Sequence, residues 1–418
     1  MALLFLCLIF GTGRTQKIEA AVQNVPESLE EESRLDTVGT DQETERAAVR
    51  EKKGQQEKEA GDTETDQAAA AQDELLAELD FDAIQQEVDS LLSSQQFSFA
   101  GTVRSLLQDG DPFRTFRAGN AVLSCAKTAF LAQKGLMKEL FLLVLAGAVL
   151  GSFSSLFEGK QVRDASFYMV YLLALALILK NFQSSGENLK AVITSLVAFM
   201  RILTPSYYLA AAAAGGASSA VMFYQMLLLV ILAVEKLLLA LVLPMIHIYL
   251  LIALVNDLSG EEILSHMTEL LETCVNGLLK SSLGVLVGMQ MIRNLIAPAL
   301  DSLRQMALWR TAGMIPGIGN AVNAVTELVA GSAVLIRNCF GVTAMLVLLA
   351  AGMVPAVQLL VSSLSFRLLA AAAQPVSDKR IAGCLAAAGK GYAMLLRLLL
   401  TVEVLFLLTI AILAGTFS

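Results

Sequence analysis

Long uncharged apolar runs fill the chain from position 140 onward. Leu140–Phe157, Ala165–Leu179, Ile202–Val234 and Asn338–Phe366 all lack Asp, Glu, Lys and Arg. About 20 consecutive apolar residues are enough to cross a bilayer as a helix, and runs of this length and number are not typical of soluble cores. They predict a membrane domain over 136–418.

Further apolar stretches bring the expected number of spans to about seven or eight. These stretches are Leu237–Val255, Ser281–Ile292, Thr311–Ile336 and Leu398–Phe417. Ile202–Val234 is longer than one crossing requires and contains Pro205 and Gly215-Gly216, so we expect it to divide into a short entry helix and a full span. The predicted fold class is all-α: a polytopic membrane helix bundle with Pro- and Gly-broken helices, preceded by a disordered acidic arm and an amphipathic helix.

The first ten residues, Met1–Phe10, are almost all apolar, as in a secretory signal. The small-residue site around Ala20 then predicts a signal peptide over 1–21. However, no Lys or Arg precedes the apolar core, whereas Arg14 and Lys17 follow it. An uncleaved anchor, or a gene start placed too far downstream, therefore remains an alternative.

Composition separates an acidic arm from the apolar body. The whole chain is 56% hydrophobic, 16% charged and carries a net charge of −8, against about 25% charged residues in a soluble domain. Between Lys17 and Leu91 lie 22 acidic and 7 basic residues, so the net charge averages two unlike parts. Residues 22–72, nearly free of aromatics, cannot bury enough apolar area to offset their ordering entropy and are predicted to be disordered.

An amphipathic helical region is predicted over 73–135. From Asp73 to Leu92 the apolar residues recur at three- and four-residue steps, with acidic residues on the opposite face. Anionic headgroups would repel that face, so the helix is expected to dock on a partner or to pack on its own chain. A second, weaker amphipathic stretch runs from about Phe97 to Leu107.

Two halves of the membrane domain share a proline spacing. Pro205 and Pro244 are 39 positions apart, as are Pro316 and Pro355. Many transporters place a midplane site between repeats with broken helices at matching positions. The spacing suggests repeat units at 190–293 and 301–416, although Ala, Leu and Val at this density also produce chance matches.

Charged and helix-breaking residues inside the apolar runs are the candidate functional positions. A charged side chain in hydrocarbon costs at least about 2.5–3.5 kcal/mol, so it normally faces a bundle interior, a partner or water. These groups either line a polar pathway or subunit contact, or hold helices together. The Gly-rich segment Gly313–Asn320 is either a re-entrant loop or a simple interfacial turn. The candidate positions are Glu235, Lys236, Glu327, Glu403, Pro205, Pro244, Pro316, Gly317, Gly319, Asn320 and Pro355.

Catalytic and cofactor motifs are missing from the sequence. The two histidines, His247 and His266, form no zinc-protease pattern, and no nucleophile elbow or phosphate loop occurs. The five cysteines are widely separated and suggest neither disulfides nor a metal site. We therefore expect no enzyme activity and no cofactor, and a lone His247 in a span is expected to serve helix packing.

Several segments together resemble the stage III sporulation protein AE family of endospore-forming bacteria. The resemblance covers roughly 75–418, and the Ala-rich body and the leader depart from the family pattern. The segments that carry it are Leu79–Ile84, Phe97–Phe99, Ile315–Val322, Gly331–Asn338, Gly341-Val342 and Gln374–Ile381.

The resemblance implies a membrane component of a mother-cell-to-forespore channel complex, similar to a secretion system and required for endospore development. The implied partners are the other stage III A sporulation membrane proteins, a forespore membrane partner and the lipid bilayer, with no nucleic acid. The implied location is the mother-cell membrane that engulfs the forespore. The alternative is a stand-alone secondary transporter with a midplane site between the two repeats.

Overall fold

The computed structural model describes residues 80–92, 97–109, 118–154, 160–213, 218–259, 264–312 and 319–415. All of these belong to the second of two compact units, Asp66–Ser418. The regular secondary structure in these ranges is helical throughout, which confirms the all-α class. The predicted signal peptide (1–21) and disordered segment (22–72) lie outside the described residues.

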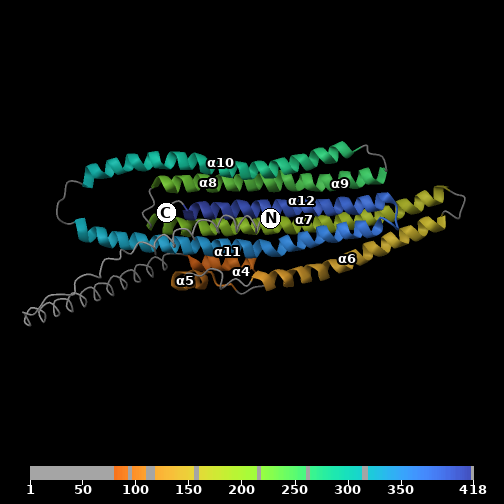
Figure 1. Ribbon diagram of the computed structural model, residues 1–418, viewed down its shortest axis with the longest axis horizontal. Helices are drawn as coiled ribbons and strands as arrows, with labels where there is room; N and C mark the ends of the chain where they lie inside the picture. Colours follow the sequence, from red (N-terminus) through yellow and green to blue (C-terminus); the bar gives the residue numbers. More distant parts are fainter. Residues whose placement is uncertain are drawn as a thin grey trace, which may run out of the picture. The chain divides into compact units, whose positions relative to one another are not determined.

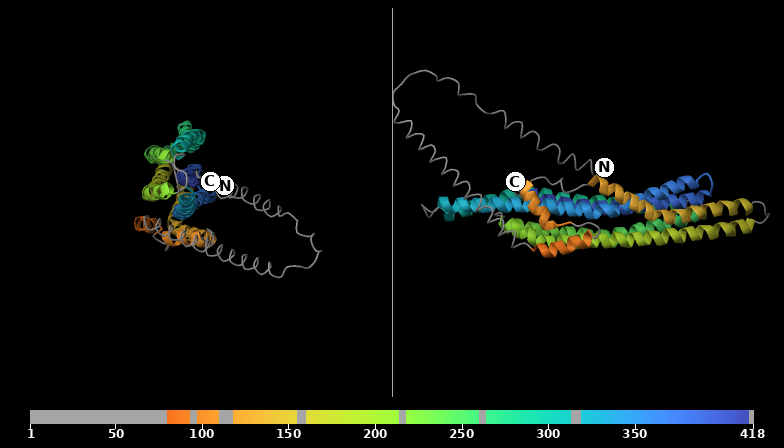
Figure 2. Two further views of the ribbon diagram at one scale, coloured as in Figure 1. Left: turned by 90° about the vertical axis from the view of Figure 1, so that its left-hand side faces the viewer. Right: turned by 90° about the horizontal axis from the view of Figure 1, so that it is seen from below.

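Two short helices precede a set of long ones that run side by side (Figures 1 and 2). The close pairing of α11 with α12 is the most extensive contact among them. The helices are α4 (Phe81–Leu91), α5 (Phe99–Asp109), α6 (Ala118–Ser154), α7 (Lys160–Ala213), α8 (Ser218–Leu237), a π-helix η1 (Leu238–Val242), α9 (Leu243–Ser259), α10 (Ser265–Ala312), α11 (Gly319–Ala373) and α12 (Lys379–Gly415).

Five helical segments of the described chain are long and apolar enough to cross a membrane. They are Phe167–Tyr207, Leu228–Ser259, Ser265–Met289, Gly331–Ala373 and Lys379–Ala411. The expected count of seven or eight is not confirmed. One reason is that the helices continue through charged residues at which the sequence runs were divided: α7, for example, contains all of Ala165–Leu179 and the start of Ile202–Val234. The five also come from the described residues alone, and the predicted run Leu140–Phe157 extends beyond them.

Three of the predicted helix-breaking prolines, Pro205, Pro244 and Pro355, lie inside helical stretches that continue past them. The α-helical conformation of α7 continues through Pro205, and that of α11 continues through the buried Pro355. Before Pro244 the chain widens into η1, where the Leu243 N–H donates to the Leu238 carbonyl five residues back. A proline cannot donate to the residue four positions earlier, so a single wide turn accommodates Pro244 without ending the helix.

The amphipathic helix α4 packs on its own chain. Its Ile84 and Val88 are fully buried, and the Asp80 side chain accepts a hydrogen bond from the Ala83 N–H at the first turn. Gln85 joins α4 to α5: its amide nitrogen donates to the Phe97 carbonyl, and its oxygen accepts from the next helix's first N–H. Of the two predicted roles, self-packing is the one observed, with α4 against α7 and α5 against α11.

An aromatic cluster fixes this N-terminal pair of helices to the bundle. The Phe99 ring of α5 lies edge-on to Phe340 of α11, with centroids 5.0 Å apart. Phe81 of α4 and Tyr207 of α7 lie 6.2 and 6.3 Å from the same Phe340 ring. Because Phe340 and Phe99 are fully buried, the cluster excludes water between four helices.

Large apolar side chains remain exposed along the outside of the bundle. Met169 is 77% exposed, and Leu229 and Leu368 are each 67% exposed. Glu235, Arg337 and Glu403, by contrast, are buried. An apolar outside with charged groups inside is the polarity of a protein that faces lipid.

Candidate functional site: polar groups inside the bundle

Glu403 lies at the contact between α12 and α11. Its side chain is 8% exposed and sits directly on the backbone of Gly352, where a Cβ at position 352 would occupy the place of the carboxyl group. Only glycine permits this approach. The Glu403 Oε1 atom is buried and has no hydrogen-bond partner in the part of the chain that the structure describes. Pro355 lies one turn further along α11, so two predicted positions share one neighbourhood.

Glu235 lies near the end of α8 and is 6% exposed. Arg201 of α7 acts on it electrostatically across the helix contact. Lys236 is exposed, since neighbouring residues on a helix point about 100° apart. The two adjacent charges therefore have different environments, and η1 begins immediately beyond Leu237.

The other predicted positions on α11 and ahead of it are not seen in contact with Glu235 or Glu403 in the described residues. Gly319 and Asn320 are the first residues of α11, and the backbone at Glu327 is helical. Pro316 and Gly317 lie outside the described residues, so the re-entrant loop stays a prediction. Among the described residues no hydrogen bond or ion pair links Glu235 to Glu403.

A polar cluster around Tyr392 was not predicted from the sequence. The Asn181 side-chain amide of α7 donates to the Tyr392 hydroxyl at 2.7 Å, and the Ser185 hydroxyl lies 3.4 Å from the same oxygen. The rings of Phe182 and Phe366 lie 5.1 and 5.2 Å from the Tyr392 ring. Since Tyr392 is fully buried, these bonds satisfy a polar group that would otherwise be stranded in the core.

His247 of α9 packs against Gly186 of α7, next to the Tyr392 cluster. Its Nδ1 lies 2.9 Å from the Leu243 carbonyl, and its ring meets Phe182 edge-on at 5.3 Å. The opposite nitrogen, Nε2, faces the backbone of Gly186, where an added Cβ would lie 2.5 Å away. His247 therefore joins α9 to α7 by packing against Gly186 and Phe182, while its hydrogen bond stays within α9.

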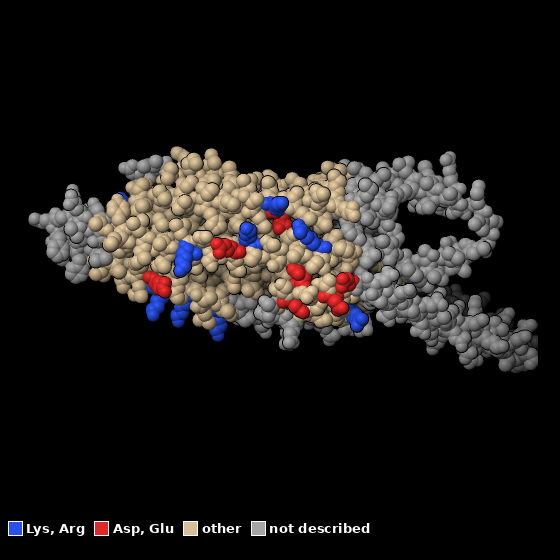
Figure 3. Space-filling model, turned by 180° about the vertical axis from the view of Figure 1, so that it is seen from behind, with Lys and Arg blue, Asp and Glu red and all other residues tan. Residues whose placement is uncertain are grey.

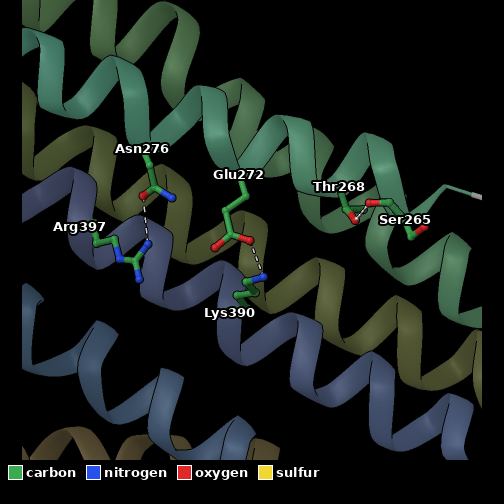
Figure 4. Close-up of polar contacts among 6 residues, drawn as sticks. All are labelled: Ser265, Thr268, Glu272, Asn276, Lys390 and Arg397. Carbon is green, nitrogen blue, oxygen red and sulfur yellow. Dashed lines mark hydrogen bonds and ion pairs between the residues drawn. The ribbon is translucent and has the colours of Figure 1, made fainter. Parts of the chain in front are cut away.

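Polar side chains rather than close backbone packing join α10 to α12 (Figure 4). Glu272 forms an ion pair with Lys390, and one turn further the Arg397 guanidinium donates to the Asn276 side-chain oxygen at 3.0 Å. Glu272 and Asn276 are four residues apart, so they share one face of α10. That spacing was visible in the sequence, but the partner helix was not.

Exposed charges form a belt where four helices meet. Three consecutive residues of α12 touch three other helices: Gly389 lies against Arg367 of α11, Lys390 pairs with Glu272 of α10, and Gly391 contacts Phe182 of α7. On the face in Figure 3, charged side chains lie in a band across the middle, with nearly uncharged surface above it. We define the charge belt as the exposed residues Lys180, Glu187, Lys190, Arg367, Lys390 and Arg397.

Metal ligands do not gather in the described ranges. No group of three His, Cys, Asp or Glu side chains there could hold a metal ion. Cys274, Cys339 and Cys384 are free thiols. The described polar groups are buried carboxyls, hydroxyls and the charge belt. Such groups can exchange protons, form ion pairs and hold helices in contact.

Five helices long and apolar enough to cross a membrane, with charged groups buried between helices, are the features of an α-helical membrane protein. The profile of the stage III sporulation protein AE family matches residues 97–416, and the chain belongs to that family. It is 22% identical over 291 residues to stage III sporulation protein AE of Bacillus subtilis (strain 168), covering 69% of this chain and 73% of that protein. No solved structure matches the chain. The family resemblance proposed from the sequence is thereby confirmed, which supports a role in sporulation.

Proposed function

We propose that this chain is a non-enzymatic membrane component of the channel complex between mother cell and forespore. Its partners would be the other stage III A sporulation membrane proteins and a forespore membrane protein. It would lie in the mother-cell membrane that engulfs the forespore. The observation that carries this proposal is the family match over 97–416, together with five helices able to cross a membrane.

The polarity of the bundle supports a role inside a membrane assembly. Many of its exposed side chains are large and apolar, whereas Glu235 and Glu403 are buried. The belt of exposed charge across the same bundle is unsuited to lipid and suited to water or to polar groups of another protein. We therefore place the proposed contacts with partners, or with an aqueous conduit, along this belt.

Genetics and purification test the proposal together. Deleting the gene in its sporulating host should abolish heat-resistant spores, and the full chain expressed from a second locus should restore them. A tagged full chain should copurify from sporulating cells with other stage III A proteins. Normal sporulation without the gene would refute the proposal, and solute movement by the chain alone in liposomes would favour the transporter alternative.

The number of crossings and the domain boundaries form a second part of the proposal. We propose seven or eight crossings within 136–418, a helical region at 73–135, and a signal peptide ahead of the acidic arm. Reporter fusions at about positions 60, 160, 260, 310, 380 and 418 would map the side of the membrane, because loops alternate sides with each crossing. A cytoplasmic report at position 60 would show that the signal-peptide prediction is wrong.

A further inference from the structure

Glu403 is a buried carboxyl with no ionic or hydrogen-bond partner in the described chain. Its side chain is 8% exposed, and Oε1 is fully buried without a donor. A carboxylate without a partner is among the costliest groups to hold in an apolar interior, and such groups usually take up a proton. The position therefore requires either a ligand or the neutral acid.

The Glu403 carboxyl occupies the space left by the missing side chain of Gly352 on α11, which we call the cradle. Position 352 is glycine, and any larger residue there would displace the Glu403 side chain. Pro355 has no N–H, so the helical hydrogen bond to the carbonyl of Ala351, the residue next to Gly352, is missing. The turn of α11 that carries Gly352 thus also contains a carbonyl without its helical donor, so it offers a carboxylate no compensating positive group.

The charged groups on the surrounding helices do not neutralise Glu403. Across the described ranges, none of them forms an ion pair or hydrogen bond with it. The charged residues and histidines whose side chains are described on the helices packed against α12 are Lys180, Glu187, Lys190 and Arg201 of α7, Glu235 and Lys236 of α8, His247 and Asp257 of α9, His266, Glu269, Glu272 and Lys280 of α10, and Arg337 and Arg367 of α11. A proton therefore remains the simplest group that could remove the charge.

We infer that Glu403 is a reversible proton-binding site at the α11–α12 contact. The carboxylate takes a proton from hydronium, forming an O–H bond and releasing water, and the neutral acid rests on Gly352. Loss of the proton would place an unpaired charge between the two helices and weaken their packing. The charge state of Glu403 would thus control how closely α11 and α12 approach.

Carbodiimide labelling of the purified full chain tests this site. Dicyclohexylcarbodiimide is apolar and adds to a protonated carboxyl, leaving a mass increment on that residue. We expect an adduct at Glu403 in liposomes, formed more slowly as the pH rises from about 6 to about 9, and none in Glu403→Gln. Glu235 is the internal control: it is equally buried but has Arg201 nearby, so it should label more slowly.

Three results would overturn the inference. These are a folded protein without an adduct at Glu403, a labelling rate independent of pH, or protection by sodium at constant pH, which would identify a cation site instead. Gly352→Ala should reduce labelling by filling the cradle, whereas Gly331→Ala on the same helix, with open space around it, should not. Size-exclusion profiles of each variant verify folding, and none of these readouts depends on the sporulation assay.

Discussion

Replacing Gly186 with alanine tests the packing of α7 against α9. A Cβ at position 186 would lie 2.5 Å from His247 Nε2, well inside ordinary contact distance. The imidazole ring cannot move away freely, because Nδ1 is hydrogen-bonded to the Leu243 carbonyl and the Phe182 ring packs edge-on against it. Either the helices separate or the imidazole loses its hydrogen bond.

The expected change in the free energy of unfolding combines two destabilising contributions and one stabilising contribution. Overpacking a tight contact costs about 1–3 kcal/mol. The hydrogen bond between His247 and the Leu243 carbonyl, within α9, contributes about 0.5–1.5 kcal/mol. Alanine gains about 1 kcal/mol over glycine in a helix. Gly186→Ala should therefore lower the free energy of unfolding by about 1–2 kcal/mol.

Gly277→Ala is the matched control for this variant. Nothing lies within 4 Å of a Cβ at position 277, so the same substitution there should be neutral or stabilising. Unfolding of both variants would be followed by SDS titration in mixed micelles, using helix content as the signal. His247→Ala in the Gly186→Ala background should recover most of the loss, giving a coupling energy of about 1–2 kcal/mol.

Two outcomes would refute the reasoning about this contact. In the first, Gly186→Ala is as stable as Gly277→Ala. In the second, the effects of Gly186→Ala and His247→Ala are additive, which would mean that the two residues do not touch in solution.

Three further variants test other contacts of the bundle. Tyr392→Phe leaves the Asn181 amide without its acceptor and should lower the free energy of unfolding by about 1 kcal/mol; an unchanged value would mean that Asn181 finds another partner. Lys390→Ala should cost at most about 0.5 kcal/mol, because the lysine is 49% exposed; a loss above about 1 kcal/mol would mean that the ion pair is shielded from water. Phe340→Ala should cost about 3 kcal/mol and make α4 and α5 sensitive to limited proteolysis; a protease-resistant variant would contradict the anchoring role of this ring.

The local pattern of apolar and charged residues predicted helices and buried positions correctly where one face of a helix is buried. The three- and four-residue spacing around Ile84 and Val88 predicted α4, and the structure buries those two residues. Glu403 was predicted as a costly charge inside an apolar run, and it is buried. Each of these predictions uses residues close together in the sequence, so no knowledge of the fold is required.

Contacts between distant helices could not be predicted in the same way. Asn181 and Tyr392 are 211 positions apart, and no spacing rule pairs them. Gly352 stands in an Ala- and Leu-rich run, where a glycine carries no signal until Glu403 is placed opposite it. Pro205, Pro244 and Pro355 do not end their helices for a different reason: each removes one hydrogen bond, and packing of the remaining helix tolerates that loss.

The lengths of the helices explain why counting spans from the sequence and from the structure gives different numbers. Phe167–Tyr207 has 41 residues, or about 60 Å of helix, whereas the hydrocarbon core is about 30 Å thick. The charge belt crosses this helix at Lys180, Glu187 and Lys190, so a straight α7 can place only one of its apolar parts in lipid without burying those charges. Yet exposed apolar side chains occur at Met169 of α7, ahead of the belt, and also on another helix, at Leu229 of α8. The apolar part that lipid does not cover needs protein to cover it, and this requirement fits a subunit of a larger membrane complex better than a transporter working alone.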